Sequence, residues 1–263
     1  MPTSHTWPRG FLLTRRINNR NIILVALKRT CKQFLMIDAI RYLVAYPRYL
    51  YYAKLRRKLK LFKLSSKDIN SIAISHNLLG LGGQAVVRSN QLLRPLSVID
   101  TVYNKLEDLD VLSIGPRTEG EILNLVGFGF SRKKIKALDL FSYSPWIEVG
   151  DMHSMPYVNN SFDVIISGWV IAYSDNKKKA AQEMIRVARP GAIIAIGVAY
   201  YPPGTKRIGA SGKLHISPEK FIESVQDIIG LFGESVGTVY FQQDVINRNK
   251  PYAQNLIAIF SVK

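Results

Sequence analysis

From residue 110 onward, short apolar runs alternate with longer segments of helical periodicity. The apolar runs, interpreted as strands, cover residues 111–114, 135–138, 163–167, 192–198, 236–241 and 256–262. The helical segments between them cover residues 119–126, 175–189 and 217–231. The last of these opens with Ser217, Pro218 and Glu219, which is the order of a helix cap, a first-position proline and a first-turn acid. This alternation predicts an α/β fold: a doubly wound, Rossmann-like, mainly parallel sheet with helices on both faces.

Ahead of this region the pattern is helical over residues 21–65. One apolar stripe, at spacings of three and four residues, consists of Tyr52, Leu55, Leu59 and Phe62. Pro47 is expected to start this helix or to kink it away from the preceding segment. A further helix is expected over residues 97–106. We therefore divide the chain into a basic amphipathic helical extension, residues 1–75, and a domain, residues 76–263, with lead-in helices over 76–109 and a core over 110–263.

Charge is distributed unevenly between these parts. The 263-residue chain has a formal charge of +17, and the stretch from Arg9 to Lys67 holds 16 of the 36 Lys and Arg residues against one acid, Asp38. That stretch carries +15 and the remainder only +2. A polyanionic partner is expected for the basic stretch, either nucleic acid or an anionic membrane surface.

Composition narrows the class of protein further. With 47% hydrophobic and 21% charged residues, wholesale disorder is excluded. One cysteine, Cys31, excludes an internal disulfide framework and is compatible with a reducing compartment. No apolar run approaches the roughly 20 residues that a membrane-spanning helix needs. We expect a cytoplasmic protein, soluble or peripheral at a membrane, and no metal site.

Candidate chemistry gathers directly after the apolar runs. In an open α/β sheet, ligands bind outside the carboxyl ends of the strands. Asp139 ends the second run, where a carboxylate can accept hydrogen bonds from both hydroxyls of a ribose. Asp151 and Met152 could serve an adenine, the carboxylate accepting from its amino group and the thioether packing on the ring. After the first run, the glycine pattern of a dinucleotide site is absent, and the acids Glu119 and Glu121 suit an ammonium group instead. Adenosine with a cationic tail therefore fits better than a dinucleotide.

Five segments in order resemble the successive motifs of class I S-adenosylmethionine-dependent methyltransferases, of the small-molecule type. They are residues 111–115, Asp139, residues 150–157, residues 161–167 and residues 186–191. The resemblance covers about residues 108–200 and implies a cofactor, S-adenosylmethionine, lying across Gly115, Asp139, Asp151 and Ser167. The candidate cofactor-binding residues are Gly115, Pro116, Arg117, Glu119, Asp139, Leu140, Asp151, Met152, His153, Ser167, Gly168 and Trp169.

Three features depart from the family pattern. Residues 116–118 stand where the family carries glycines at alternate positions, and Pro116 has no backbone N–H to donate. Only twelve positions separate Asp139 from Asp151, which is short for a crossover with its own helix, so residues 141–146 are expected to form a turn or a single helical turn. Residues 172–173 replace the Glu-His pair that many relatives place after the fourth strand.

Several single residues have two interpretations. His153 could be a general base, although the family position packs beside adenine. Trp169 and Tyr173 could contact the sulfonium or the acceptor through their ring faces, or belong to the core. His215, near the end of the loop expected over residues 201–216, is more simply a surface histidine. No general base is nominated, so the catalytic residues stay open.

These observations favour methyl transfer from S-adenosylmethionine to a small-molecule, glycan or lipid-linked acceptor, by in-line displacement in which proximity and orientation contribute most. Residues 9–67 would rest on an anionic membrane surface, because apolar and aromatic side chains are interleaved with the Lys and Arg. The alternatives are an RNA methyltransferase that uses the basic stretch as its binding arm, and a non-catalytic binding protein on a methyltransferase fold.

Overall fold

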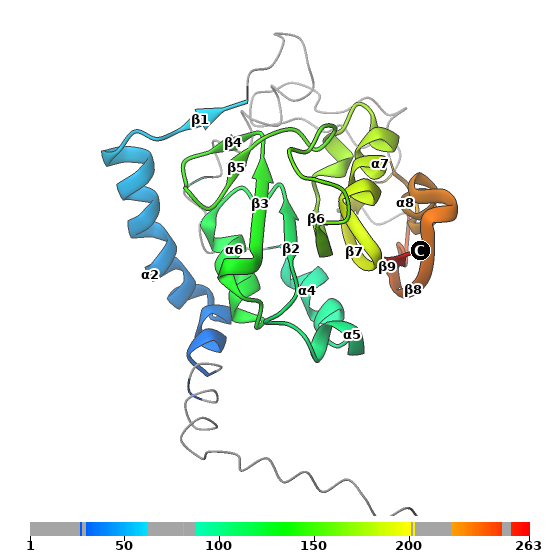
Figure 1. Cartoon of the computed structure of the whole chain (residues 1–263), viewed down its shortest axis with the longest axis horizontal. Coiled ribbons are helices and arrows are strands. Elements are labelled where there is room, and N and C mark those ends of the chain that lie inside the picture. Colours follow the sequence, from blue (N-terminus) through cyan, green and yellow to red (C-terminus); the bar gives the residue numbers. More distant parts are fainter. Residues whose placement is uncertain are drawn as a thin grey trace, which may run out of the picture.

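The computed structural model describes residues 30–62, 88–200, 222–248 and 254–263, together with Leu27, Leu81 and Pro202. Its centre is a seven-stranded sheet in the order β5-β3-β2-β6-β7-β9-β8 (Figure 1). The strands are β2 (Val111–Ile114), β3 (Ile135–Asp139), β5 (Glu148–Val149), β6 (Phe162–Gly168), β7 (Ala188–Tyr200), β8 (Val236–Gln243) and β9 (Gln254–Val262). The strands from β5 to β7 pair in parallel, and β9 is antiparallel to both β7 and β8. The expected mainly parallel sheet is therefore confirmed.

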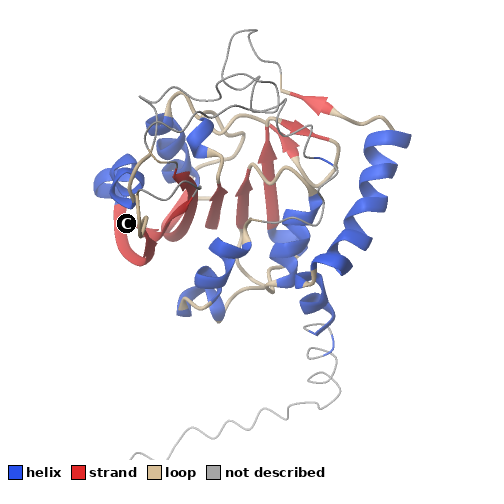
Figure 2. Cartoon of the chain, turned by 180° about the vertical axis from the view of Figure 1, so that it is seen from behind, coloured by secondary structure: helices blue, strands red, loops and turns tan. Residues whose placement is uncertain are grey.

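Helices cover both faces of this sheet, as expected (Figure 2). They are α4 (Asn90–Ser97), α5 (Asp100–Tyr103), α6 (Glu119–Gly127), α7 (Lys177–Val187) and α8 (Val225–Phe232). Because side chains alternate along a strand, β2 serves two cores: Val111 packs with α4, α5 and α6, whereas Leu112 and Ile114 pack with α7 and α8. The apolar runs that became β2, β6, β7 and β9 are thus largely buried on both sides, whereas the edge strand β8 is mostly exposed.

The N-terminal segment lies along the outer edge of the domain. It comprises η1 (Phe34–Met36), α2 (Asp38–Tyr49), the π-helical segment η2 (Leu50–Leu55) and β1 (Lys60–Leu61), which pairs antiparallel with β4 (Phe141–Ser142). Helix α2 packs against α6, and in Figure 1 it forms the blue column beside the sheet. The remaining short elements are η4 (Arg132–Lys134), η5 (Ile171–Tyr173) and η7 (Gly233–Ser235).

Local structure differs from the expectation in this segment. The helix expected to reach residue 65 ends at Leu55, and the chain reverses at Arg57, whose φ is +47°, to enter β1. The physical reason is a tertiary contact: residues 60–61 pair with β4, and this pairing replaces the helical hydrogen bonds that local periodicity predicts. Pro47 lies inside α2 and not at its start. The expected boundary at residues 75 and 76 lies outside the described residues.

The helix expected over 97–106 is only partly present. Within that range the structure has the short α5, and the longer α4 lies before it and ends at Ser97. No helix crosses between β3 and β5, where residues 141–146 form β4 and a turn as expected. Helix α7 begins at Lys177, with the Asn176 side chain accepting from the backbone N–H of Lys179.

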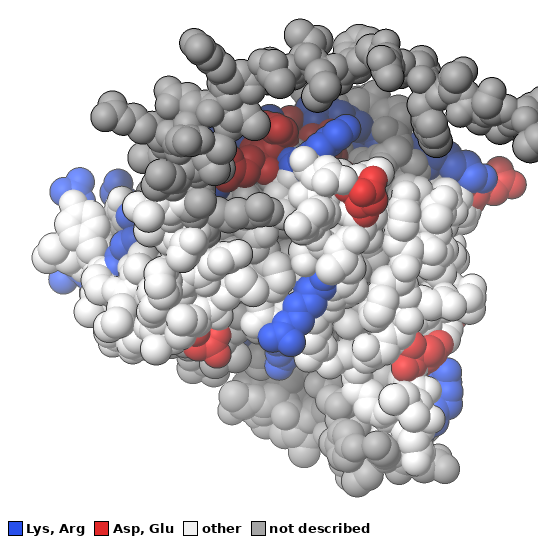
Figure 3. Space-filling view, turned by 90° about the horizontal axis from the view of Figure 1, so that it is seen from below, with Lys and Arg blue, Asp and Glu red and all other residues white. Residues whose placement is uncertain are grey.

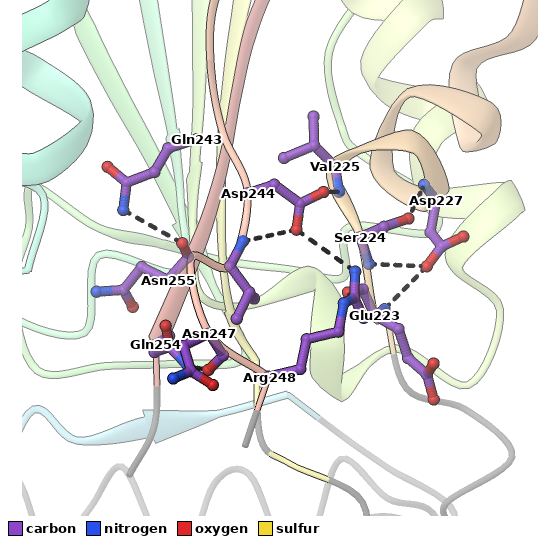
Figure 4. A network of polar contacts seen from close by, with 11 residues as sticks. Glu223, Ser224, Val225, Asp227, Gln243, Asp244, Asn247, Arg248, Gln254 and Asn255 are labelled. Carbon is purple, nitrogen blue, oxygen red and sulfur yellow. Dashed lines mark hydrogen bonds and ion pairs between the residues drawn. The ribbon is translucent and has the colours of Figure 1, made fainter. Parts of the chain in front are cut away.

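The carboxyl-terminal helix has a complete N-terminal cap (Figure 4). Ser224 accepts from the backbone N–H of Asp227, and the Asp227 carboxylate accepts from the backbone N–H of Ser224. Asp244, just after β8, accepts from the N–H of Val225 and joins α8 to the edge of the sheet. The helix start expected at Ser217 lies outside the described residues.

None of the helices in the described ranges has the length and hydrophobicity to cross a bilayer.

Candidate functional site

A pocket opens at the carboxyl ends of β2, β3 and β6, where the sequence placed the candidate chemistry. Nine of the twelve candidate residues line it: Gly115, Pro116, Arg117, Asp139, Leu140, Asp151, Met152, Gly168 and Trp169. Further lining residues come from the strands, from α6 and from the segment before α4: Arg88, Ser89, Ser113, Ile114, Glu121, Leu125, Leu138, Gly150, Ile166, Val170 and Tyr173. The other three candidates, Glu119, His153 and Ser167, are buried outside the lining.

The loop after β2 brings its backbone close to a neighbouring loop. Gly115 has a φ of +68°, and a Cβ atom there would lie 2.1 Å from Cγ1 of Val170. No other residue type fits this position, because both the dihedral angle and the space demand glycine. Arg117 and Trp169 also line the pocket with positive φ, +57° and +60°. Such dihedrals cost energy for side-chain-bearing residues and cluster at functional sites.

Asp139 ends β3 with its side chain buried at the pocket wall. Its Oδ2 accepts from the backbone N–H of Arg117 at 3.0 Å. Burial raises the pKa of this carboxyl from 3.8 to about 6, although backbone N–H donors of Arg117, Leu140 and Phe141 pull it down. A buried carboxylate with unused acceptor capacity is suited to a ligand that donates hydrogen bonds.

Asp151 is held by the residue that follows Met152. The His153 backbone N–H donates to Oδ1 of Asp151 at 2.9 Å, and its ring Nδ1 lies 2.6 Å from the same oxygen. The other ring nitrogen, Nε2, lies 2.6 Å from the hydroxyl of the buried Ser174. Burial raises the pKa of Asp151, but the hydrogen bonds and charge of His153 outweigh it and leave that pKa below its ordinary value. His153 therefore fixes the orientation of Asp151 from outside the pocket.

The two acids of the first turn of α6 point in different directions. Glu119 is fully buried and forms an ion pair with Arg48 of α2, and the hydroxyl of Ser144 also donates to it. Glu121 lines the pocket, where burial raises its pKa and the hydroxyl of Ser89 donates to it. Glu121 thus takes the place in the pocket that the candidate set gave to Glu119.

Three lining residues had little signal in the sequence. Arg88 and Ser89 lie more than twenty residues ahead of β2, so a rule based on strand ends cannot find them. Glu121 shares an acidic loop with Glu119, and nothing in the pattern says which acid faces the ligand. The side-chain oxygen of Ser167 is buried without a hydrogen-bond partner in the described part of the protein. His215 lies outside the described residues.

The sheet is mainly parallel with an antiparallel β9, and its pocket lies at the ends of β2, β3 and β6. In open α/β sheets, ligands bind at this edge. Residues 119–196 match a protein-family model described as "Methyltransferase domain". This match supports the class I S-adenosylmethionine-dependent methyltransferase family for this part of the chain, in agreement with the resemblance of its five motifs.

Two curated relatives align with part of the chain. A demethylmenaquinone methyltransferase of Desulfitobacterium hafniense (strain Y51) is 34% identical over 83 residues, 29% of this chain and 33% of the relative. A norajmaline N-methyltransferase of Rauvolfia serpentina is 43% identical over 49 residues, 19% of this chain and 17% of the relative. The matched segments therefore span a third or less of these relatives' own lengths.

Among solved structures, the N-methyltransferase NodS of Bradyrhizobium japonicum WM9, in complex with S-adenosyl-L-homocysteine, is 15% identical with a TM-score of 0.49. That alignment covers 74% of this chain and 99% of NodS. A sarcosine dimethylglycine methyltransferase homologue of Galdieria sulphuraria is 17% identical with a TM-score of 0.49, covering 68% of this chain and 87% of that one.

Proposed function

We propose that this protein binds S-adenosylmethionine in the pocket and transfers its methyl group to an acceptor. The observation that carries the proposal is the convergence of two carboxylates on one pocket. Asp139 is the last residue of β3, and Asp151 follows β5, the strand paired with β3. Acids at these two positions suit the ribose hydroxyls and the adenine amino group of one nucleoside.

Each half of the nucleoside has a partner among the lining residues. The Asp139 carboxylate accepts from the ribose hydroxyls, and Leu140 and Pro116 pack beside the sugar. The Asp151 carboxylate accepts from the adenine amino group while Met152 packs on the ring, and His153 keeps Asp151 in place. Gly115 has no side chain, so its backbone is open to the ligand. A side chain is excluded there because Val170 fills the space that it would need.

The methionine tail is assigned to charged residues of the lining. Burial raises the pKa of Glu121, and a cation bound beside it would favour the ionised carboxylate. The α-ammonium of the cofactor supplies that cation, and Arg88 and Arg117 supply the positive charge for its carboxylate. This arrangement replaces the glycine-rich loop of the family, in which backbone donors approach the tail.

When bound, the cofactor supplies an electrophilic methyl carbon with a neutral thioether as its leaving group. The chain's part is to bind and orient. Trp169 and Tyr173 lie at the pocket wall, where aromatic faces stabilise a sulfonium cation. Holding the acceptor atom about 3–3.5 Å from the methyl carbon supplies much of the rate by proximity. An oxygen acceptor also loses a proton, and no lining residue is assigned as its base.

We infer that the acceptor is a small molecule, a glycan or a lipid-linked intermediate, met by a cytoplasmic enzyme that rests peripherally on a membrane. The second candidate is a binding protein without transfer activity. It is favoured by the loop after β2, where Pro116 has no N–H to donate and Arg117 occupies a left-handed conformation.

One experiment separates the two. The full chain is incubated with methyl-labelled S-adenosylmethionine and extracts divided into lipid, glycan, small-molecule and RNA fractions. Label transferred to a fraction by the wild type and not by Asp139→Asn supports transfer and identifies the acceptor class. Cofactor binding without transfer to any fraction supports the binding protein.

A further inference from the structure

Surface helices usually bury apolar side chains and expose charged ones, but helix α2 buries an arginine and exposes a leucine. Its inner face, against α6, buries Arg41, Ala45 and Tyr49. Its outer side leaves Leu43 71% exposed. A helix that buries an arginine while exposing a leucine requires a reason, because the hydrophobic effect favours the reverse.

Two arginines fix this orientation. Arg41 is fully buried, donates to the backbone carbonyl of Leu35 at 2.7 Å and reaches the side-chain oxygen of Asn124 on α6. Arg48, seven residues further along the chain, pairs with Glu119, and its Cζ lies 4.0 Å from the centroid of the Trp146 ring. Rotating α2 to bury Leu43 would break both sets of contacts. The apolar outer face is therefore held outward by the fold.

The apolar exposure continues past the end of α2. Leu55 is 74% exposed, and further exposed apolar side chains along the same segment are Val44, Leu50, Tyr51, Leu59 and Leu61. Several exposed apolar side chains gathered in one segment are typical of a site of interaction with another molecule or a membrane.

Positive charge accompanies this apolar surface. Five exposed basic side chains are interleaved with it: Lys54, Arg56, Arg57, Lys58 and Lys60. In the described part of the chain, none of the five forms an ion pair with a carboxylate. Figure 3 shows, at the edge where α2 lies in Figure 1, Lys and Arg groups beside white surface and no acidic group.

We propose that the outer face of residues 43–61, the α2–β1 surface, docks on an anionic lipid bilayer. Leucine and tyrosine side chains enter the boundary between headgroups and acyl chains, while the lysines and arginines lie at the level of the anionic headgroups. Charge complementarity and apolar exposure in one segment support this occupant. RNA would use the positive charge but would leave Leu43 and Leu55 without a role.

Docking deepens the proposed function, because it places the methyltransferase beside a lipid-linked acceptor. It does not depend on methyl transfer, so the two fail separately. The binding assay uses the full chain and vesicles of phosphatidylcholine alone or of phosphatidylcholine and phosphatidylglycerol in equal parts. Binding of S-adenosylhomocysteine is measured on the same samples by calorimetry, and unfolding curves show that each variant is folded.

Two variants test the two components separately. Lys54→Gln/Arg56→Gln removes two exposed charges, and Leu43→Ala/Leu55→Ala removes the most exposed leucines. Each is expected to weaken binding to the anionic vesicles at least ten-fold without changing cofactor affinity. Matched controls at exposed positions elsewhere are Lys105→Gln/Lys133→Gln for the charge and Val98→Ala/Ile246→Ala for the apolar side chains, and neither is expected to change binding more than two-fold.

Binding to anionic vesicles that is lost in both test variants and kept in both controls supports the proposal. Binding that survives the leucine substitutions shows attraction to charge alone and overturns it. Binding to a single-stranded RNA of mixed sequence, with none to anionic vesicles at low salt, overturns it in favour of a nucleic-acid arm.

Discussion

The buried ion pair between Arg48 and Glu119 ties the N-terminal helix to the loop that lines the pocket. Arg48 donates to both carboxylate oxygens, with Nη2 3.1 Å from Oε1, and this hydrogen bonding raises the pKa of Arg48. Glu119 has no solvent exposure, whereas the Arg48 side chain is 30% exposed. Glu119 also lies in the first turn of α6, where the helix dipole favours a negative charge.

We expect Arg48→Met to lower the free energy of unfolding by about 3 kcal/mol, because it leaves a buried carboxylate without its partner. The lower end of the usual range applies because Arg48 is partly solvated. Glu119→Gln removes the charge and keeps the shape, and about 1 kcal/mol is expected from the weaker hydrogen bonds. The double variant should lose less than the two single losses combined, with a coupling energy of at least about 1.5 kcal/mol.

The assay is urea unfolding of the four proteins, followed by tryptophan fluorescence and circular dichroism. Lys136→Met is the control, since Lys136 and Glu148 form an exposed pair that is expected to contribute less than about 1 kcal/mol. Additive losses from Arg48→Met and Glu119→Gln would refute the reasoning, because they would show that the pair is not coupled.

Three further predictions concern the pocket. Gly115→Ala should abolish binding of S-adenosylhomocysteine in calorimetry and destabilise the fold more than Gly191→Ala, which shares a positive φ but meets no atom within 4 Å; equal effects would contradict the steric argument. Because Asp139 has a folded pKa of about 6 against 3.8, its stabilising contribution is present below pH 3.8 and is lost as pH rises through about 6. Asp139→Asn should therefore be more stable than wild type at pH 8, by up to about 3 kcal/mol in unfolding curves, while wild-type cofactor affinity falls below pH 6; a destabilised variant would refute the assignment. His153→Gln should raise the KM for the cofactor about ten-fold with kcat unchanged, as expected when a support of Asp151 is lost, whereas a fall in kcat alone would indicate a general base.

The central strands β2, β6, β7 and β9 could be predicted from the sequence because they are largely buried on both faces and form short apolar runs. Val164 and Ile165 of β6, for example, are fully buried and pack in opposite cores. The residues at the strand ends were predictable because they directly follow these apolar runs. Parallel strands bring their carboxyl ends to one edge, which places Asp139 and Asp151 at one pocket.

The remainder depends on tertiary contacts that periodicity does not encode. The helix expected through residue 65 stops early because β1 pairs with β4, which is 80 residues away in the sequence. The stripe of Tyr52, Leu55, Leu59 and Phe62 predicts one apolar helix face but not whether it is buried. Leu55 is exposed, and the preceding helix is anchored on its other side by Arg41 and Arg48. Likewise, only the packed structure distinguishes Glu119, paired with α2, from Glu121, which lines the pocket.

The central claim is tested most directly by calorimetric titration of the full chain with S-adenosylhomocysteine at pH 8. The account predicts saturable binding at one site, weakened at least ten-fold, about 1.4 kcal/mol, in Asp139→Asn and unchanged in Asp108→Asn, an exposed acid outside the pocket. Absence of heat up to about 1 mM ligand would contradict it, because a Kd of about 1 mM corresponds to a binding free energy of only about −4 kcal/mol. Equal affinity in Asp139→Asn and the wild type would contradict it as well.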